Sequence, residues 1–326
     1  MLDYLKVIEN SKAYQMVCQD AKNGRLSHAY LFVSVDENYL KTFQEMVSKL
    51  FLNLNETENV EKNNMRIEKR IHPDVKVFGE EKNIDVQTVS TIVEASSVAP
   101  FEADKKIFVL TGVQNMNEAS QNKILKTIEE PPKNTFFILT ATGVSRILQT
   151  IISRVKQIEL DELKVNDLEE MLVQKGVSYD KAQIFASCAN ANGTFAEKLA
   201  TDDGFVDFFN NIVSCFFEIN ASRDVLKYSN IFTQKSVDKE DFFNICLLVS
   251  RDLMMILVGK PDMVVCKNIL PKLKVAASML KIEAVEVLIE TCIKAKENLH
   301  FNVNSTAVID NFLFKLAEVK VKCRRS

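Results

Sequence analysis

Two short apolar runs with a helical stretch and a proline pair between them constrain this chain most. The runs, residues 107–110 and 136–139, are rich in β-branched and aromatic residues and short enough to be buried strands. Between them Asn117 can cap a helix, and an acidic residue follows in the first turn. That helix must end at Pro131-Pro132, because proline lacks the N–H donor and forces the preceding residue out of the helical region. This order of strand, helix and strand predicts a βαβ crossover in a parallel sheet.

A short segment after the second strand leads to an arginine. Residues 148–151 are followed by Ser153 and Arg154. Taken alone, an arginine after a short strand is usually a solvated surface residue, since arginine is mostly exposed. The pattern that precedes this arginine gives it a second interpretation.

That pattern resembles a known family. The stretch NEASQNKILKTIEEPPKNTFFILTA, followed by LQTIISR, is similar to the clamp-loader branch of the AAA+ proteins, and within it to the delta prime subunits of bacterial DNA polymerase III. Those proteins carry an N-A-L-L-K-x-L-E-E-P-P pattern and a Ser-Arg-Cys motif, whose cysteine is replaced here by Val155. The matching positions are Asn122, Leu125, Lys126, Glu129, Glu130, Pro131, Pro132, Ser153 and Arg154.

The resemblance implies a fold and its division. We expect an α/β AAA+ domain, a parallel sheet flanked by helices, over residues 1-160, and a small helical lid domain over 161-203. Residues 204-326 are expected to form an all-α collar domain that serves oligomerisation. Their apolar stripes at helical spacing, as in FVDFFNNIVSCFF, agree with this expectation. Part of that apolar surface is core, and a surplus beyond the core favours association.

Composition is that of a multidomain protein. A chain of 326 residues with 47% hydrophobic residues can bury two or three cores. Its 41 basic and 44 acidic residues give a net charge of −3, so no strong overall field attracts nucleic acid. It has neither an apolar run of membrane-spanning length nor a secretory amino-terminal pattern, so we expect a cytoplasmic protein. The seven cysteines are scattered, and we expect reduced core residues rather than disulfides or metal ligands.

The segment in which an AAA+ ATPase binds phosphate is degenerate. The pattern G-x-x-x-x-G-K-[ST] would follow the first strand, but residues 34–42 read SVDENYLKT and contain no glycine. Glycines let backbone amides approach a phosphate closely, and Asp36 and Glu37 would repel the anion. We therefore expect no bound cofactor. The residues of this degenerate loop are Ser34, Lys41 and Thr42.

Two further parts of the nucleotide machinery are missing. In an active ATPase the strand at 107–110 would end in carboxylates that hold magnesium, whereas residues 111–115 read TGVQN. In active relatives an arginine three residues after the lid glycine reaches the nucleotide, and Ala196 stands at that place. These departures predict that the chain hydrolyses no ATP on its own.

No metal site is expected. Many delta prime relatives carry a four-cysteine zinc module before an H-P-D element, which His72-Pro73-Asp74 resembles here. This chain has no cysteine between Cys18 and Cys188, so a tetrahedral thiolate site cannot be built.

The resemblance implies a non-catalytic clamp-loader subunit, part of a DNA polymerase holoenzyme. Such a subunit sits in a ring with gamma/tau-like and delta-like partners and helps to load the sliding clamp on primed DNA. Arg154, preceded by Ser153, is expected to act in trans as an arginine finger on a neighbour's ATP, because a guanidinium stays charged and offers a planar fork of donors.

Two alternatives remain open. An active gamma/tau-like DNA-dependent ATPase motor needs a usable glycine loop, which is absent. A delta-like clamp-binding subunit is not expected to keep the E-E-P-P and Ser-Arg elements, which are present.

Overall fold

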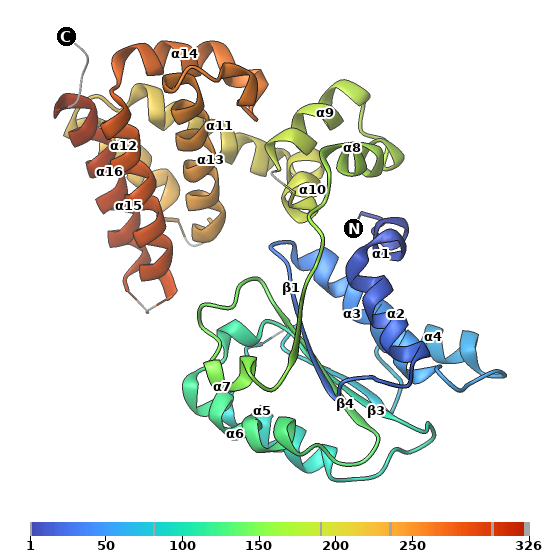
Figure 1. Cartoon of the computed structure of the whole chain (residues 1–326). Coiled ribbons are helices and arrows are strands. Elements are labelled where there is room, and N and C mark those ends of the chain that lie inside the picture. Colours follow the sequence, from blue (N-terminus) through green and yellow to red (C-terminus); the bar gives the residue numbers. More distant parts are fainter. Residues whose placement is uncertain (1, 81, 190, 235–236, 301–302, 323–326) are drawn as a thin grey trace. The chain divides into compact units, whose positions relative to one another are not determined.

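The chain folds into two compact units (Figure 1). The computed structural model describes residues 2–80, 82–189, 191–234, 237–300 and 303–322. The first unit comprises Met1–Met171 and Ala191–Phe195, and the second comprises Leu172–Asn190 and Ala196–Ser326. The finer division into three domains at residues 160 and 203 stays a prediction.

The first unit is built on a parallel sheet of five strands in the order β2-β3-β4-β1-β5. Every pairing between neighbours in this order is parallel, which confirms the sheet predicted from the βαβ pattern. The strands are β1 (Ala29–Val33), β2 (Val75–Phe78), β3 (Lys106–Leu110), β4 (Thr135–Ala141) and β5 (Lys156–Glu159).

Helices cover both faces of this sheet (Figure 1). One face carries α1 (Leu5–Asn10), α2 (Lys12–Lys22), α3 (Glu37–Leu52) and α4 (Val60–Glu68). The other carries α5 (Val86–Ser96), α6 (Glu118–Glu129) and α7 (Gln149–Ile152). A short 3-10 helix, η1 (Val113–Asn115), follows β3.

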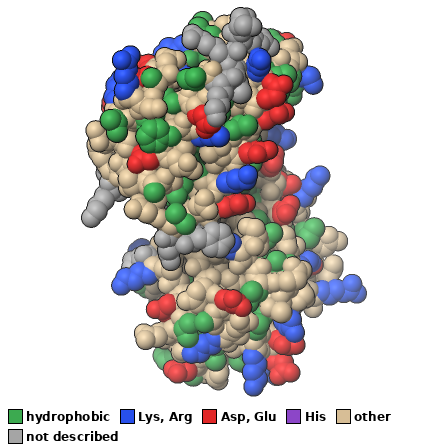
Figure 2. Space-filling model, turned by 90° about the vertical axis from the view of Figure 1, so that its left-hand side faces the viewer, with side chains coloured by type: hydrophobic (Ala, Val, Ile, Leu, Met, Phe, Trp, Pro, Cys, Tyr) green, Lys and Arg blue, Asp and Glu red, His purple; other side chains and the backbone are tan. Residues whose placement is uncertain are grey.

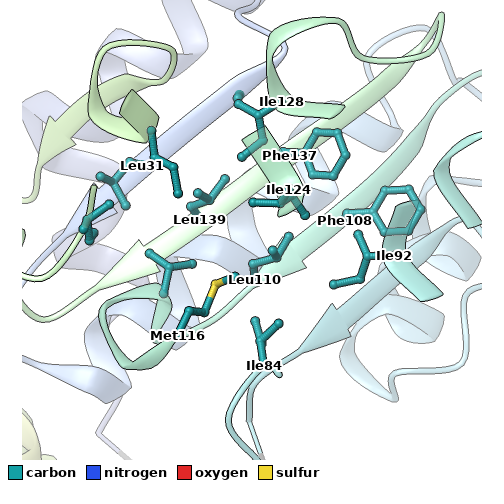
Figure 3. Packing of buried hydrophobic residues seen from close by; sticks show 14 of the residues in the cluster. Leu31, Ile84, Ile92, Phe108, Leu110, Met116, Ile124, Ile128, Phe137 and Leu139 are labelled. Atoms are coloured by element: carbon teal, nitrogen blue, oxygen red, sulfur yellow. The ribbon is translucent and has the colours of Figure 1, made fainter. Parts of the chain in front are cut away.

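A core cluster lies between the sheet and the layer of α5 and α6 (Figure 3). Strand side chains alternate between the two faces, so every second residue of the central strands enters this cluster. Phe108 and Phe137 stack there with ring centroids 5.5 Å apart. The strand and helix residues of the cluster include Leu31, Ile92, Phe108, Leu110, Ile124, Ile128, Phe137 and Leu139.

Aromatic side chains attach α3 to the opposite face of β1. Tyr30 packs on Phe51 and Phe32 packs on Phe43, with ring centroids 5.5 Å and 4.8 Å apart. Because α3 directly follows β1 in the chain, this packing places the amino terminus of α3 at the carboxyl end of β1. In open parallel sheets that end is the usual place for a ligand.

The described residues of the second unit are helical, as predicted for the carboxyl-terminal part. The helices α8 (Val165–Gln174) and α10 (Gly193–Thr201) each contribute residues to both units. The remaining helices are α9 (Tyr179–Cys188), α11 (Asp203–Glu218), α12 (Ser222–Phe232), α13 (Lys239–Leu257), η2 (Pro261–Met263), η3 (Lys267–Ile269), α14 (Leu270–Met279), α15 (Ile282–His300) and α16 (Ser305–Lys322).

Five of the six cysteines that the structure describes lie in cores, as expected. Cys188, Cys215, Cys246, Cys266 and Cys292 are buried and free. Cys18 is half-buried and also free, and Cys323 lies outside the described residues. Among the helices that the structure describes, none combines the length and apolarity needed to cross a membrane.

Candidate functional site

The amino terminus of α3 is capped by Asp36, whose side chain is fully buried. Its Oδ1 accepts hydrogen bonds from the backbone amides of Asn38 and Tyr39, at 3.1 Å and 3.2 Å. Amides at the start of a helix are the groups that phosphate-binding proteins direct at their ligand. Here an internal carboxylate takes them.

Three more donors from distant parts of the chain converge on the same carboxylate. Tyr4 donates its hydroxyl to Asp36 Oδ2 at 3.1 Å, and the Gly193 amide donates to the same oxygen at 2.7 Å. Thr194 donates its hydroxyl to Oδ1 at 2.6 Å. A buried charge is tolerated only when it is paired or fully hydrogen-bonded, and these donors meet that requirement.

Gly193 permits this approach because it has no side chain. A Cβ built at Gly193 would lie 2.5 Å from Tyr4 Oη and 2.9 Å from Asp36 Oδ2. The glycine at the start of α10 therefore brings a backbone amide into contact with a buried carboxylate.

The remaining residues of the degenerate loop lie near Asp36 but differ in their partners. Ser34 Oγ accepts from the Asp36 amide at 3.3 Å. Lys41 forms an ion pair with Glu80 at 3.6 Å and is about half exposed. Thr42 donates its hydroxyl to the Asn38 carbonyl, at 2.9 Å, within α3. Only Ser34 of these three thus joins the hydrogen bonds around Asp36.

The carboxyl ends of β3 and β4 carry neutral polar groups. Thr111 donates its hydroxyl to the Phe78 carbonyl at 3.0 Å. Gly112 has a φ of +63°, which begins the η1 turn. Gln114 then donates to Thr142 Oγ1 at 3.0 Å. Two neighbouring strand ends are therefore linked by an amide and a hydroxyl, at the place where an ATPase would hold magnesium with carboxylates.

His72 and Asp74 of the H-P-D element hold a loop. The buried Asp74 carboxylate accepts hydrogen bonds from the backbone amides of Phe101, Glu102 and Ala103, at 2.6 Å, 2.9 Å and 2.9 Å. Burial alone would raise the pKa of Asp74, but these amides outweigh burial and hold the pKa below its ordinary value. Burial and the nearby Arg66 lower the pKa of His72. No group of three or more possible metal ligands occurs among the described residues.

Arg154 follows the one-turn helix α7, which forms the short segment after β4. Its hydrogen bonds are local: the Ser153 amide donates to the Gln149 carbonyl at 3.0 Å. Arg154 Nη1 donates to the Thr150 carbonyl at 3.0 Å, and Nη2 donates to Glu129 Oε1 at 3.1 Å. Ser153 also donates its hydroxyl to the Thr150 carbonyl, at 3.1 Å.

Gln121 holds the segment that leads to Arg154, and sequence reasoning missed it. Its buried side chain donates to the carbonyls of Met116 and Arg146, at 3.0 Å and 2.9 Å, and accepts from the Leu148 amide at 2.8 Å. A signal was present: Gln121 shares the apolar stripe of α6, three and seven residues before Ile124 and Ile128. A polar residue on such a stripe needs internal partners.

Asp36 and Arg154 lie at opposite ends of the parallel strands. Strands β1 and β5 are parallel and paired from Tyr30 with Lys156 to Val33 with Glu159. Asp36 follows the carboxyl end of β1, whereas Arg154 precedes the amino end of β5. At a rise of about 3.3 Å per residue, the length of the paired segment alone separates the two strand ends by roughly 10 Å. Arg154 is therefore remote from the amides at the start of α3 in its own chain.

Comparison with known proteins gives related results at three levels. The family model described as DNA polymerase III, delta subunit, matches residues 9–164. The DNA polymerase III subunit delta' of Bacillus subtilis is 26% identical over 317 residues, covering 94% of this chain and 96% of that protein. The subunit gamma of Buchnera aphidicola (subspecies Acyrthosiphon pisum) is 25% identical over 244 residues, covering 70% of this chain and 65% of that protein.

Among solved structures, a gamma subunit-related protein of DNA polymerase III from Thermotoga maritima aligns with 93% of this chain and 99% of its own, at 15% identity and a TM-score of 0.46. The sequence similarities are to subunits of one assembly, and the similarity to delta' extends over nearly the whole length. The chain is therefore similar to the clamp-loader subunits of bacterial DNA polymerase III, and to delta' over nearly its whole length.

Proposed function

We propose that the chain is a non-catalytic, delta prime-like subunit of the clamp loader of the DNA polymerase III holoenzyme. In this role it supplies Arg154 to ATP bound by a neighbouring subunit and has no ATPase activity of its own. One observation carries the proposal. At the carboxyl ends of the strands, Asp36 accepts hydrogen bonds from the amides at the start of α3, while Arg154 lies at the amino ends.

The carboxylate of Asp36 opposes nucleotide binding to this chain. A phosphate at the start of α3 would have to displace a buried anion from donors on α3, Tyr4, Gly193 and Thr194. Two anions cannot share these donors, because like charges in a buried site repel each other strongly. The repulsion between a phosphate and the buried Asp36 carboxylate favours a chain without a bound cofactor.

The chemistry of Arg154 suits a role in trans. Its side chain is 34% exposed, so a neighbouring molecule can reach it. A guanidinium stays charged and presents a planar fork of N–H donors to phosphate oxygens as negative charge develops. In other phosphoryl-transfer systems such arginines change the rate by about 10³- to 10⁵-fold.

The partners follow from the family. We infer gamma/tau-like and delta-like subunits as direct partners in the cytoplasm, with the collar helices from residue 204 onward as the main assembly surface. The sliding clamp and primed DNA are then reached through the complex. On the face shown in Figure 2, basic and acidic side chains lie interspersed, which agrees with DNA contact made mainly by the assembly.

The test is a clamp loader reconstituted with Arg154→Ala. Loss of the fork should lower DNA-stimulated ATPase and clamp-loading rates at least about 10-fold, a threshold set below the effects of about 10³- to 10⁵-fold in other phosphoryl-transfer systems. Arg154→Lys should recover little, because lysine keeps the charge but loses the fork. Arg25→Ala, which removes another exposed arginine from the same unit, is the matched control. Unchanged rates with Arg154→Ala in a normally assembled complex would reject the proposal.

Two measurements on the isolated chain address the alternatives. ATP turnover with primed DNA that scales with the chain through purification would favour a gamma/tau-like motor. Direct binding of the sliding clamp by the isolated chain would favour a delta-like subunit. We expect neither.

A further inference from the structure

The guanidinium of Arg154 is held between the carboxyl ends of two helices. Nη1 reaches the Thr150 carbonyl in the single turn of α7, and Nη2 reaches Glu129, the last residue of α6. The final carbonyls of a helix have no partner within the helix and carry partial negative charge, so both ends favour a cation between them.

Glu129 is an unusual residue for a helix end. A carboxylate in the last turn is disfavoured by the helix dipole, and a basic residue is preferred there. The proline pair ends α6 at Glu129, so this carboxylate lies in the last turn although the helix dipole disfavours it there. Within the described part of the chain its charge has one favourable interaction, the ion pair with Arg154 at 3.1 Å.

We propose that Glu129 is a positioning residue for Arg154, holding the guanidinium in the orientation that meets the neighbouring subunit's ATP. This inference rests on the proposed function. A free arginine carries about 2 kcal/mol of rotamer entropy, part of which is lost in advance when the side chain is held in place. The second N–H of Nη2 makes no hydrogen bond within the described part of the chain and is free to donate to a phosphate oxygen.

The ion pair is suited to orienting the arginine without trapping it. Glu129 is 53% exposed and Arg154 is 34% exposed, and ion pairs at such surfaces are weak because water screens them. A phosphate carrying several negative charges can therefore compete for the fork when the neighbour arrives. Glu129 does not itself touch the nucleotide in this scheme.

The experiment is a double-mutant cycle in the reconstituted clamp loader. The variants are Glu129→Ala, Arg154→Ala and the double variant, and steady-state ATPase gives kcat and the KM for ATP. Coupled side chains show interaction energies of about 0.5–3 kcal/mol. We therefore expect Glu129→Ala to lower kcat about 3- to 10-fold with a KM changed less than about twofold. The double variant should be no slower than Arg154→Ala alone.

Two further variants separate positioning from general charge or folding effects. Glu129→Gln keeps an acceptor oxygen and should recover part of the lost rate. Glu130→Ala removes the adjacent exposed carboxylate, which forms no ion pair in the described structure, and should change kcat less than about twofold.

The possible outcomes are distinguishable. A faster enzyme with Glu129→Ala overturns the inference, because Glu129 then restrains the arginine rather than orienting it. If Glu129→Ala lowers kcat by the same factor with and without Arg154→Ala, the inference is also overturned, because Glu129 then does not act through Arg154. If Arg154→Ala itself has no effect, the proposed function fails and the positioning role fails with it.

Discussion

At the scale of single residues, one carboxylate determines the chemistry of the carboxyl edge of the sheet. The acidic character of this loop was visible in the sequence and predicted repulsion of phosphate. The structure adds that Asp36 is itself the bound anion, with donors from α3, Tyr4, Gly193 and Thr194. A phosphate that entered this site would have to break these hydrogen bonds, which favours the proposed chain without a bound nucleotide.

The close approach at Gly193 leads to a stability prediction. Gly193→Ala should lower the free energy of unfolding by about 1–3 kcal/mol, because the new methyl group collides with Tyr4 Oη and Asp36 Oδ2. Urea denaturation followed by circular dichroism measures the change. Gly143→Ala is the matched control, since a Cβ at Gly143 meets nothing within 4 Å. Equal stability of the two variants would mean that Asp36 does not hold Gly193 in this way.

At the scale of elements, α6 is the part that connects the core to the arginine. Asn117 caps it by accepting from the Ser120 amide at 2.8 Å, and the helix ends at Glu129 before the prolines, both as predicted. Its buried face enters the core through Ile124 and Ile128. Its carboxyl end contacts Arg154, and Gln121 holds the loop that leads into α7.

Gln121 provides the element-scale prediction. Gln121→Met keeps a similar volume but leaves the carbonyls of Met116 and Arg146 and the Leu148 amide without this partner. We expect a loss of about 1–3 kcal/mol in unfolding free energy, the usual cost of unsatisfied buried polar groups. Faster hydrogen exchange over residues 146–154 should accompany it, because the loop before Arg154 loses its anchor.

The control for Gln121 is Gln87→Met on α5, where the side chain is exposed. Little change is expected there, as for most surface substitutions. If Gln121→Met alters neither stability nor exchange near Arg154, α7 is held by other contacts.

At the scale of the whole molecule, the chain has two compact units, and we expect a substitution in the core of one unit to change the stability of that unit. In the second unit Lys320 Nζ donates to the Ile219 carbonyl at 2.9 Å, and burial lowers the pKa of Lys320 to about 8. In the unfolded chain a lysine titrates near pH 10.4. Between these values the unfolded state binds more protons, so raising the pH stabilises the folded second unit.

Lys320→Met should therefore remove a pH-dependent contribution to stability. The variant should gain stability relative to the parent near pH 7, on the order of 3 kcal/mol before the loss of the hydrogen bond to Ile219 is subtracted. This relative gain should diminish as the pH rises from about 8 to about 10.5. Denaturant melts at several pH values measure it, and Lys315→Met on the same helix controls for loss of a surface lysine. If the stability difference between variant and parent stayed constant from about pH 8 to about pH 10.5, the lowered pKa of Lys320 would be contradicted.

The sequence by itself determined the features that depend on neighbours along the chain. The apolar runs, the Asn117 cap and the proline pair predicted strand, helix and strand, because these signals act through local backbone geometry and local hydrogen bonds. The ordered motif around Glu129 and Arg154 indicated the family, and the missing glycines indicated a degenerate phosphate loop.

Tertiary structure alone decided which distant groups meet. Asp36 gathers Tyr4, Gly193 and Thr194 from segments far apart in sequence, and Gln121 reaches two loops at once. The parallel pairing of β1 with β5 places Asp36 and Arg154 at opposite ends of the strands. These relations follow from strand order, register and the packing of helices on the sheet. A pattern of local propensities carries no such information, because any one residue's partners are chosen by the fold as a whole.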